Sequence, residues 1–429
     1  MRFLINTFIK HRDAFALAMF LAGIPIVYFL RDGLNLLPGN TFFAIILIFF
    51  PLGVALLFKN YRHFYKPNPV TFPMLCLLMG FMLAYCLLKD RYYLTYSISR
   101  EMVSYALIML TALCVVFMPP RAIGNSFIYW VLFLSFLGAA SLIYYVSINP
   151  FYVMGQRASF AFAGETGGNP HINSRGAFFG IVASVLALKY HKTIKLGLIL
   201  PVGLTILFVA ILFLTQTMVA FLTTFVFGVL FLACNFSFSN TLSLLKLFFT
   251  KWYVLLLMVM GIAALMYQFN KNKQFLDPAI SYFEYRLENL TKSFFEDESQ
   301  TKKVEETGDD SANTRIMHFV GVFERLEESI NDGNYHYVLF GQGYKFLYID
   351  IPHLEMLDSF GLIGFLFYTT IFIRIVLMCF REMRNPASIG TEFLAYILIY
   401  YLINNFTSGQ MLDHYRFATL FIASRFLKK

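Results

Sequence analysis

Three short stretches of this 429-residue chain hold residues that can bind an anion or move a proton. The first, residues 155–176, is rich in glycine and amide side chains and contains Arg157 and Arg175. A guanidinium binds a phosphate or pyrophosphate through two parallel hydrogen bonds. On composition alone, a lipid headgroup or a surface carboxylate is an equally good partner for these two arginines.

The second stretch, residues 313–318, reads Asn-Thr-Arg-Ile-Met-His and begins a helix predicted below. Basic residues on such helices usually face solvent or lipid headgroups. Arg315 differs because it stands among small polar residues at the helix start, where backbone N–H groups also favour an anion.

The third stretch, residues 340–364, begins with a Gly-Gln-Gly turn and then gathers one histidine and three carboxylates. These are Asp350, His353, Glu355 and Asp358. At the entrance of a membrane span, such groups are suited to deprotonating an acceptor hydroxyl. Each of them could instead cap a helix or satisfy a buried polar group.

The elements that must position these stretches are membrane helices. The chain is 58% hydrophobic and 14% charged, with a mean hydropathy of +0.64, whereas a soluble domain is about a quarter charged. At about 20 residues per span, a dozen spans would fill most of the chain. This composition excludes a large soluble catalytic domain, and it assigns the net charge of +9 to membrane topology rather than to nucleic-acid binding.

Apolar runs bounded by polar or Pro/Gly clusters predict about twelve membrane-spanning helices. They lie near residues 14–30, 41–58, 71–88, 103–118, 126–147, 176–188, 196–214, 217–235, 252–269, 354–380, 390–404 and 411–427. Lys and Arg in short loops mark the cytoplasmic side of a membrane. With the N-terminus inside, the cytoplasmic loops hold most of these bases, so we predict that both termini are cytoplasmic.

This orientation places a long acidic connection, residues 270–353, on the outer face. Within it, apolar residues recur at helical spacing in 280–294 and in 316–330, which predicts two amphipathic helices that lie on or cap the membrane part. The apolar positions of the second are Ile316, Phe319, Phe323, Leu326 and Ile330. The chain then divides into residues 1–147 with five spans, 148–269 with four spans, the loop 270–353, and 354–429 with three spans.

Motifs for nucleotides and metals are missing from the sequence. It has no P-loop, HExxH or GxSxG pattern, and its five cysteines lie in apolar runs without CxxC spacing. We therefore predict that the protein uses no metal and no cofactor. Few acids lie within the predicted spans, which disfavours an ion-coupled transporter.

Taken in order, the three stretches resemble the O-antigen ligase and polymerase superfamily, the Wzy-C type of membrane domain. The counterparts are Arg157 with Asn169-Pro170, Leu214-Thr-Gln-Thr217, Thr314-Arg315, Gly341-Gln-Gly343 and Gly361-Leu-Ile-Gly364. Two positions depart from the ligase pattern. Met218 follows Thr-Gln-Thr where many ligases have an arginine, and Asp350 stands where the ligase histidine usually lies, with His353 three residues later. Both departures favour a polymerase.

The resemblance implies a GT-C-like, all-helical enzyme of the bacterial inner membrane. It would transfer a glycan from undecaprenyl pyrophosphate on the periplasmic face, without ATP, to an acceptor glycan on a lipid-linked repeat unit or on lipid A-core. The pyrophosphate would be held by Arg157, Arg315 and Arg175. The general base would be His353, with Asp350 and Glu165 as further candidates.

The favoured function is therefore an O-antigen or surface-polysaccharide polymerase, for which a chain-length regulator is a candidate partner. The alternative is an O-antigen ligase that joins finished polymer to lipid A-core or to a protein. A second alternative, from another class, is a polysaccharide flippase or transporter, which would not need paired outer arginines.

Overall fold

The computed structural model describes most of the chain as helices joined by turns. The described residues are 2–36, 60–88, 98–150, 152, 156–160, 168–194, 196–235, 256, 259, 263, 310–347 and 349–427. Within these ranges no strand occurs. The chain is therefore all-helical in the part described, as predicted.

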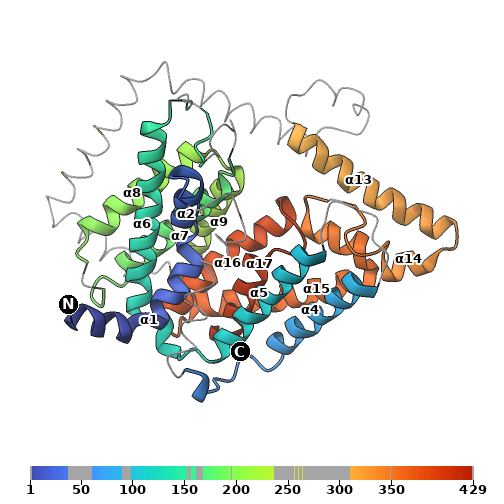
Figure 1. Ribbon diagram of the computed structural model, residues 1–429, viewed down its shortest axis with the longest axis horizontal. Helices are drawn as coiled ribbons and strands as arrows, with labels where there is room; N and C mark the ends of the chain where they lie inside the picture. The colour runs from blue at the N-terminus through green and yellow to red at the C-terminus, as the bar shows by residue number, and fades with distance from the viewer. Residues whose placement is uncertain are drawn as a thin grey trace. The chain divides into compact units, whose positions relative to one another are not determined.

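The helices follow one another along the chain as Figure 1 labels them. Those before residue 200 are α1 (Arg2–Ala22), α2 (Ile24–Tyr28), η1 (Phe29–Gly33), η2 (Asn60–Arg62), α4 (Thr71–Leu88), α5 (Ile98–Val116), η3 (Pro120–Ile123), α6 (Asn125–Ile148), α7 (His171–Lys189) and α8 (Ile199–Thr215). The later ones are α9 (Met218–Asn235), α13 (Asp310–Asn331), α14 (Tyr335–Phe340), α15 (Pro352–Arg384), α16 (Ile389–Thr407) and α17 (His414–Phe426).

Every predicted apolar run inside the described ranges falls on a helix. Among the described residues, six helices are long and apolar enough to cross a membrane, or seven if the pair 11–22 and 24–33, bent by 65°, is one broken span. The predicted runs 41–58 and 252–269 lie outside the described residues, as does the predicted amphipathic helix 280–294. A total of twelve spans and the orientation of the termini stay predictions.

The chain forms two compact units, which differ from the four predicted segments and are described separately. Unit 1 comprises residues 1–62, 118–283 and 381–400, and unit 2 comprises residues 63–117, 284–380 and 401–429. Each unit is assembled from segments far apart in the sequence. Helix α16 contributes its first part to unit 1 and its last part to unit 2.

Unit 1 packs its helices closely through small residues. A Cβ atom added to Gly138 on α6 or to Gly176 on α7 would lie 2.9 Å or 2.7 Å from the ring of Pro25 on α2. Gly180, further along α7, lies in the same way against the ring of Phe208 on α8. Small residues of this kind let membrane helices approach each other closely, because van der Waals packing replaces the hydrophobic effect there.

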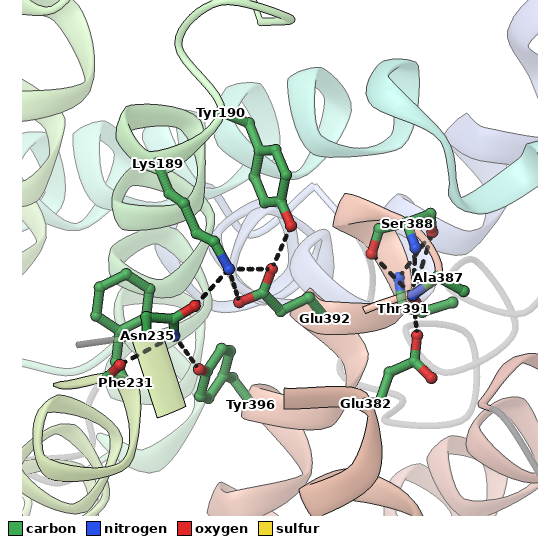
Figure 2. Close-up of polar contacts among 10 residues, drawn as sticks. All are labelled: Lys189, Tyr190, Phe231, Asn235, Glu382, Ala387, Ser388, Thr391, Glu392 and Tyr396. Carbon is green, nitrogen blue, oxygen red and sulfur yellow. Dashed lines mark hydrogen bonds and ion pairs between the residues drawn. The ribbon is translucent and has the colours of Figure 1, made fainter. Parts of the chain in front are cut away.

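A buried polar cluster joins three helix ends of unit 1, as Figure 2 shows. The ammonium of Lys189, at the end of α7, donates to both carboxylate oxygens of Glu392 on α16 at 2.7 and 2.9 Å, and to the amide oxygen of Asn235 at the end of α9. The hydroxyl of Tyr190 donates to the same carboxylate at 2.8 Å. Because Glu392 is fully buried, this pairing compensates its charge and ties the three ends together.

Unit 2 contains a helix that is broken rather than continuous. Gly361 has φ +64° and ψ −166° inside α15, so residues 352–360 and 362–384 are two helical parts at an angle. The second part alone is roughly 34 Å long at 1.5 Å per residue, which is enough to span a bilayer. The first part, which carries His353, Glu355 and Asp358, is thus a separate short helix before the span.

Helix α13 confirms a helix over 316–330, and its predicted apolar positions are divided between a small core and the exposed surface. Phe319, Phe323 and Ile330 are exposed, whereas Val322 is buried and Leu326 partly buried against a small core. That core also contains Ile349, Leu354 and Leu357, with Leu347, Ile351 and Phe365 around it. The flank that carries Arg315 and Arg325 turns inward, because these arginines form ion pairs with Asp350 and Asp358.

Candidate functional site

Arg315 and Asp350 meet in unit 2, although 35 residues separate them in the sequence. Nη2 of Arg315 lies 3.1 Å from Oδ2 of Asp350. The other carboxylate oxygen, Oδ1, accepts the backbone N–H of Gly409 at 2.8 Å. Both side chains stay partly open, at 33% and 26% exposure, so a ligand can reach the guanidinium and the carboxylate together.

His318 lies one turn after Arg315 on α13 and faces the same carboxylate. Burial lowers the pKa of its imidazole, and the nearby Arg325 lowers it further, while the charge of Asp350 opposes both effects. In the part of the chain that the structure describes, Nδ1 of His318 is buried and has no hydrogen-bond partner. The ring is therefore neutral at pH 7 beside a carboxylate, which suits a group that accepts a proton.

A second ion pair fixes the helix that carries these side chains. Nε and Nη2 of Arg325 donate to Oδ1 of Asp358 at 3.0 and 2.8 Å, and the Asp358 side chain is almost fully buried. Val322 lies between the two ion pairs and packs into the small apolar core. Arg315 is thus held on a helix whose two arginines both form ion pairs with other segments.

The Gly-Gln-Gly turn holds the segment before Asp350 in place and offers no free anion site. The backbone N–H groups of Gln342 and Gly343 donate to the carbonyls of Asp358 and Ser359 at 2.8 and 3.3 Å. After the turn, the hydroxyl of Tyr344 donates to Glu101 on α5 at 2.7 Å, and Lys345 donates to the other oxygen of Glu101 at 2.9 Å. Burial, with the nearby Tyr105 and Glu101, raises the pKa of Tyr344, so it donates as a neutral phenol.

His353, the predicted base, lies in the same unit but inside its core. Its side chain is 6% exposed. Nδ1 pairs with the amide nitrogen of Asn405, and Nε2 lies 3.0 Å from the hydroxyl of Thr369. Four aromatic rings surround the imidazole, namely those of Phe365, Tyr368, Phe372 and Phe406. With both nitrogens engaged, His353 is placed to position neighbours, and Asp350 is better placed to take a proton.

The remaining predicted site residues belong to unit 1 or lie outside the described residues. Arg157 lies in the segment 157–160, whose Ala158 donates its N–H to the carbonyl of Leu214 at the end of α8, at 2.8 Å. Arg175 is buried on the second turn of α7. Glu165 lies outside the described residues. The structure therefore brings together Arg315 and Asp350, and separately places Arg157 near the end of α8.

Sequence reasoning missed two contributions to the site in unit 2. His318 was within the second stretch, and its spacing of three residues from Arg315 places both on one helix face. That spacing could have indicated a shared site. The backbone N–H of Gly409 could not have been found, because it reaches Asp350 from a segment 59 residues later.

Comparisons with known proteins identified no relative of this chain. The chain matches no protein-family model, no curated protein and no solved structure. Among the described residues, no group of three or more His, Cys, Asp or Glu side chains could hold a metal ion.

Proposed function

We propose that the protein is a glycosyltransferase of the bacterial inner membrane that polymerises lipid-linked repeat units of an O-antigen or a related surface polysaccharide. The observation that carries the proposal is the pairing of Arg315 with Asp350 beside the neutral imidazole of His318. It supplies a cation for a pyrophosphate and a base for an acceptor hydroxyl in one partly exposed place. The donor would be a glycan on undecaprenyl pyrophosphate, and the acceptor a second lipid-linked repeat unit.

In this mechanism the acceptor hydroxyl oxygen attacks the anomeric carbon of the donor sugar. The bond from that carbon to the pyrophosphate oxygen breaks, and undecaprenyl pyrophosphate leaves with the electron pair. Arg315 stabilises the charge that develops on the leaving group. Asp350 takes the hydroxyl proton, and His318 can accept it next. Attack from the face opposite the leaving group would invert the anomeric configuration.

Asp350 replaces His353 as the favoured base for a geometric reason. A general base must come within about 3 Å of the proton that it removes. The carboxylate of Asp350 is partly exposed beside Arg315, whereas both nitrogens of His353 are occupied in the core. The roles expected of Arg157 and Arg175, which lie in unit 1, stay predictions.

A gene deletion tests polymerase against ligase. If the protein is a polymerase, lipopolysaccharide from the deleted strain carries single repeat units on the core. If it is a ligase, the core is bare and the polymer stays on the lipid carrier. If the lipopolysaccharide and every other surface glycan are unchanged in the deleted strain, both the polymerase and the ligase hypotheses are rejected.

Purified protein tests the chemistry itself. Wild-type protein should join lipid-linked repeat units without ATP or added metal, and Asp350→Asn or Arg315→Ala should stop this. If both variants form polymer at the wild-type rate, the assignment of Arg315 and Asp350 to the active site is rejected. A failure of the wild-type protein to form polymer, with movement of the lipid-linked unit across the bilayer instead, would favour a flippase.

A further inference from the structure

Two buried polar side chains in unit 1 have unused hydrogen-bonding capacity. Asn173 on α7 and Thr217 between α8 and α9 are each 3% exposed. Within the described part of the chain, neither the amide nitrogen nor the amide oxygen of Asn173 has a hydrogen-bond partner, and the hydroxyl of Thr217 has none. Buried polar groups in native proteins are almost always paired, so each exception calls for an explanation such as a bound molecule.

The two side chains lie at the same end of the unit. Helices α7 and α8 pack side by side where Gly180 meets the ring of Phe208, and a short connection makes them antiparallel. Asn173 lies about seven residues before Gly180, and Thr215 about seven after Phe208, so at 1.5 Å per residue both are at a similar level. Thr217 follows directly after the end of α8.

The segment that carries Arg157 reaches this end as well. The N–H of Ala158 donates to the carbonyl of Leu214 at 2.8 Å, three residues before Thr217. Arg175 lies two residues after Asn173 on α7. Two arginines and two unpaired polar side chains are therefore carried by backbone segments that meet at one end of unit 1.

The type of the unpaired atoms indicates what they bind. A carboxamide offers two N–H donors and an oxygen acceptor, and a hydroxyl both donates and accepts. A phosphate at pH 7 mainly accepts, so it would leave the oxygen of Asn173 without a donor. A sugar hydroxyl donates and accepts at once, and matches both side chains.

We infer that Asn173 and Thr217 bind sugar hydroxyls of the lipid-linked glycan. The inference rests on the proposed function for the identity of the glycan. Because the atoms are covered in the free protein, binding includes a local opening at this end of unit 1. A site built to pair with a hydroxyl discriminates strongly against a ligand that lacks it, so these residues select the glycosylated lipid over the bare carrier.

Because the side chains of Asn173 and Thr217 have no hydrogen-bond partner in the described part of the chain, the stability of their variants distinguishes a ligand-binding role from a structural one. Replacing a side chain that has no partner by an apolar one of similar shape removes a desolvation penalty, so the ligand-free protein should be at least as stable. The substitutions Thr217→Val and Asn173→Leu do this. Ser184→Ala is the matched control, because the Ser184 hydroxyl is also buried without a partner but lies further along α7, away from this end.

The test is a thermal-shift titration of purified wild type and the three variants with two ligands. One is the lipid-linked glycan extracted from cells of the source organism that lack this gene, and the other is undecaprenyl pyrophosphate. We expect wild type and Ser184→Ala to bind the glycosylated lipid at least about tenfold more tightly than the bare carrier, which corresponds to roughly one hydrogen bond. Thr217→Val and Asn173→Leu should lose most of this difference, keep their affinity for undecaprenyl pyrophosphate, and melt no lower than wild type without ligand.

Retention of the difference in both variants would overturn the inference, as would a wild type that binds the two lipids equally. A lower melting temperature of ligand-free Thr217→Val would also overturn it, because it would reveal a structural partner for the hydroxyl. The proposed function fails separately. If wild type binds the glycosylated lipid more tightly than the bare carrier and the variants lose this preference, while no polymer forms, the sugar-binding site is supported and the polymerase function is rejected.

Discussion

Gly341 and Gly361 pack backbone against backbone. A Cβ atom on Gly361 would lie 2.5 Å from the backbone nitrogen of Gly341, and both residues have positive φ, +64° and +75°. The contact places the break in α15 against the end of α14. From there the chain runs through Tyr344 and Lys345 to Asp350, so the position of the candidate base depends on this meeting of two glycines.

Gly361→Ala should therefore destabilise the protein and displace Asp350. This combination of φ and ψ is adopted almost only by glycine and costs another residue about 1–3 kcal/mol, and the clash with Gly341 adds to this. The melting temperature in detergent should fall, together with polymer formation. Gly80→Ala on α4 is the control, since its Cβ would meet nothing within 4 Å, and in a helix this change should be neutral or gain about 0.5–1 kcal/mol. Equal melting of Gly361→Ala and wild type would contradict the role assigned to the contact.

Asp350→Asn should abolish activity with little loss of stability. The ion pair with Arg315 is partly exposed, and exposed pairs contribute about 0–1 kcal/mol, whereas loss of a general base typically costs 10²–10⁴-fold in rate. The initial rate of polymer formation and the melting temperature of the same preparation measure the two effects. A variant with a rate within about threefold of wild type would exclude Asp350 as the base.

Arg325→Met should mainly lower the stability of the protein, in contrast to Asp350→Asn, which should mainly lower its activity. It leaves Asp358, whose side chain is only 2% exposed, without its cation, and breaking a buried pair typically costs about 3–5 kcal/mol. Thermal unfolding should show the loss. The double variant Arg325→Met/Asp358→Leu should recover much of it, because no buried charge then remains unpaired. A double variant that melts no higher than Arg325→Met would show that the pair contributes through something other than compensation of charge.

The sequence allowed prediction of the helices more fully than of their contacts. Long apolar runs determine where helices form, but the break at Gly361, inside the predicted run 354–380, was not predicted. Arg315 and Asp350 were each selected by residue type, because a guanidinium and a carboxylate indicate their chemistry directly. The burial of His353 was not predictable, since it depends on Thr369 and on Asn405, which is 52 residues away.

The contacts of α13 within the protein were not predictable for a related reason. Hydrophobic periodicity assumes that the most apolar face turns inward. Here the inward face carries Arg315 and Arg325, whose partners Asp350 and Asp358 lie in other segments. These partners lie 33 to 35 residues away in the sequence, and no pattern within the helix reveals them.

The imidazole of His318 should make the stability of the protein depend on pH. Its pKa is lowered in the folded state from the ordinary value of 6.5. Between the folded pKa and 6.5 the unfolded chain binds the proton more readily, so stability is full above pH 6.5 and is lost as the pH falls below it. His318→Gln should flatten this part of the profile of melting temperature between pH 5 and 8. Parallel profiles of variant and wild type would contradict the lowered pKa.

Lys189→Met should separate the helix ends joined in Figure 2. It leaves the fully buried carboxylate of Glu392 with only the Tyr190 hydroxyl among its cluster partners. We expect a loss of roughly 3 kcal/mol, at the low end of the range for buried pairs because Lys189 is 26% exposed. Lys189→Arg, which keeps the charge, should retain more stability than Lys189→Met, and Lys189→Met/Glu392→Leu should recover stability because no buried charge remains. Thermal unfolding of the four proteins in one detergent measures the order, and a double variant as unstable as Lys189→Met would show that the carboxylate stabilises unit 1 independently of the lysine.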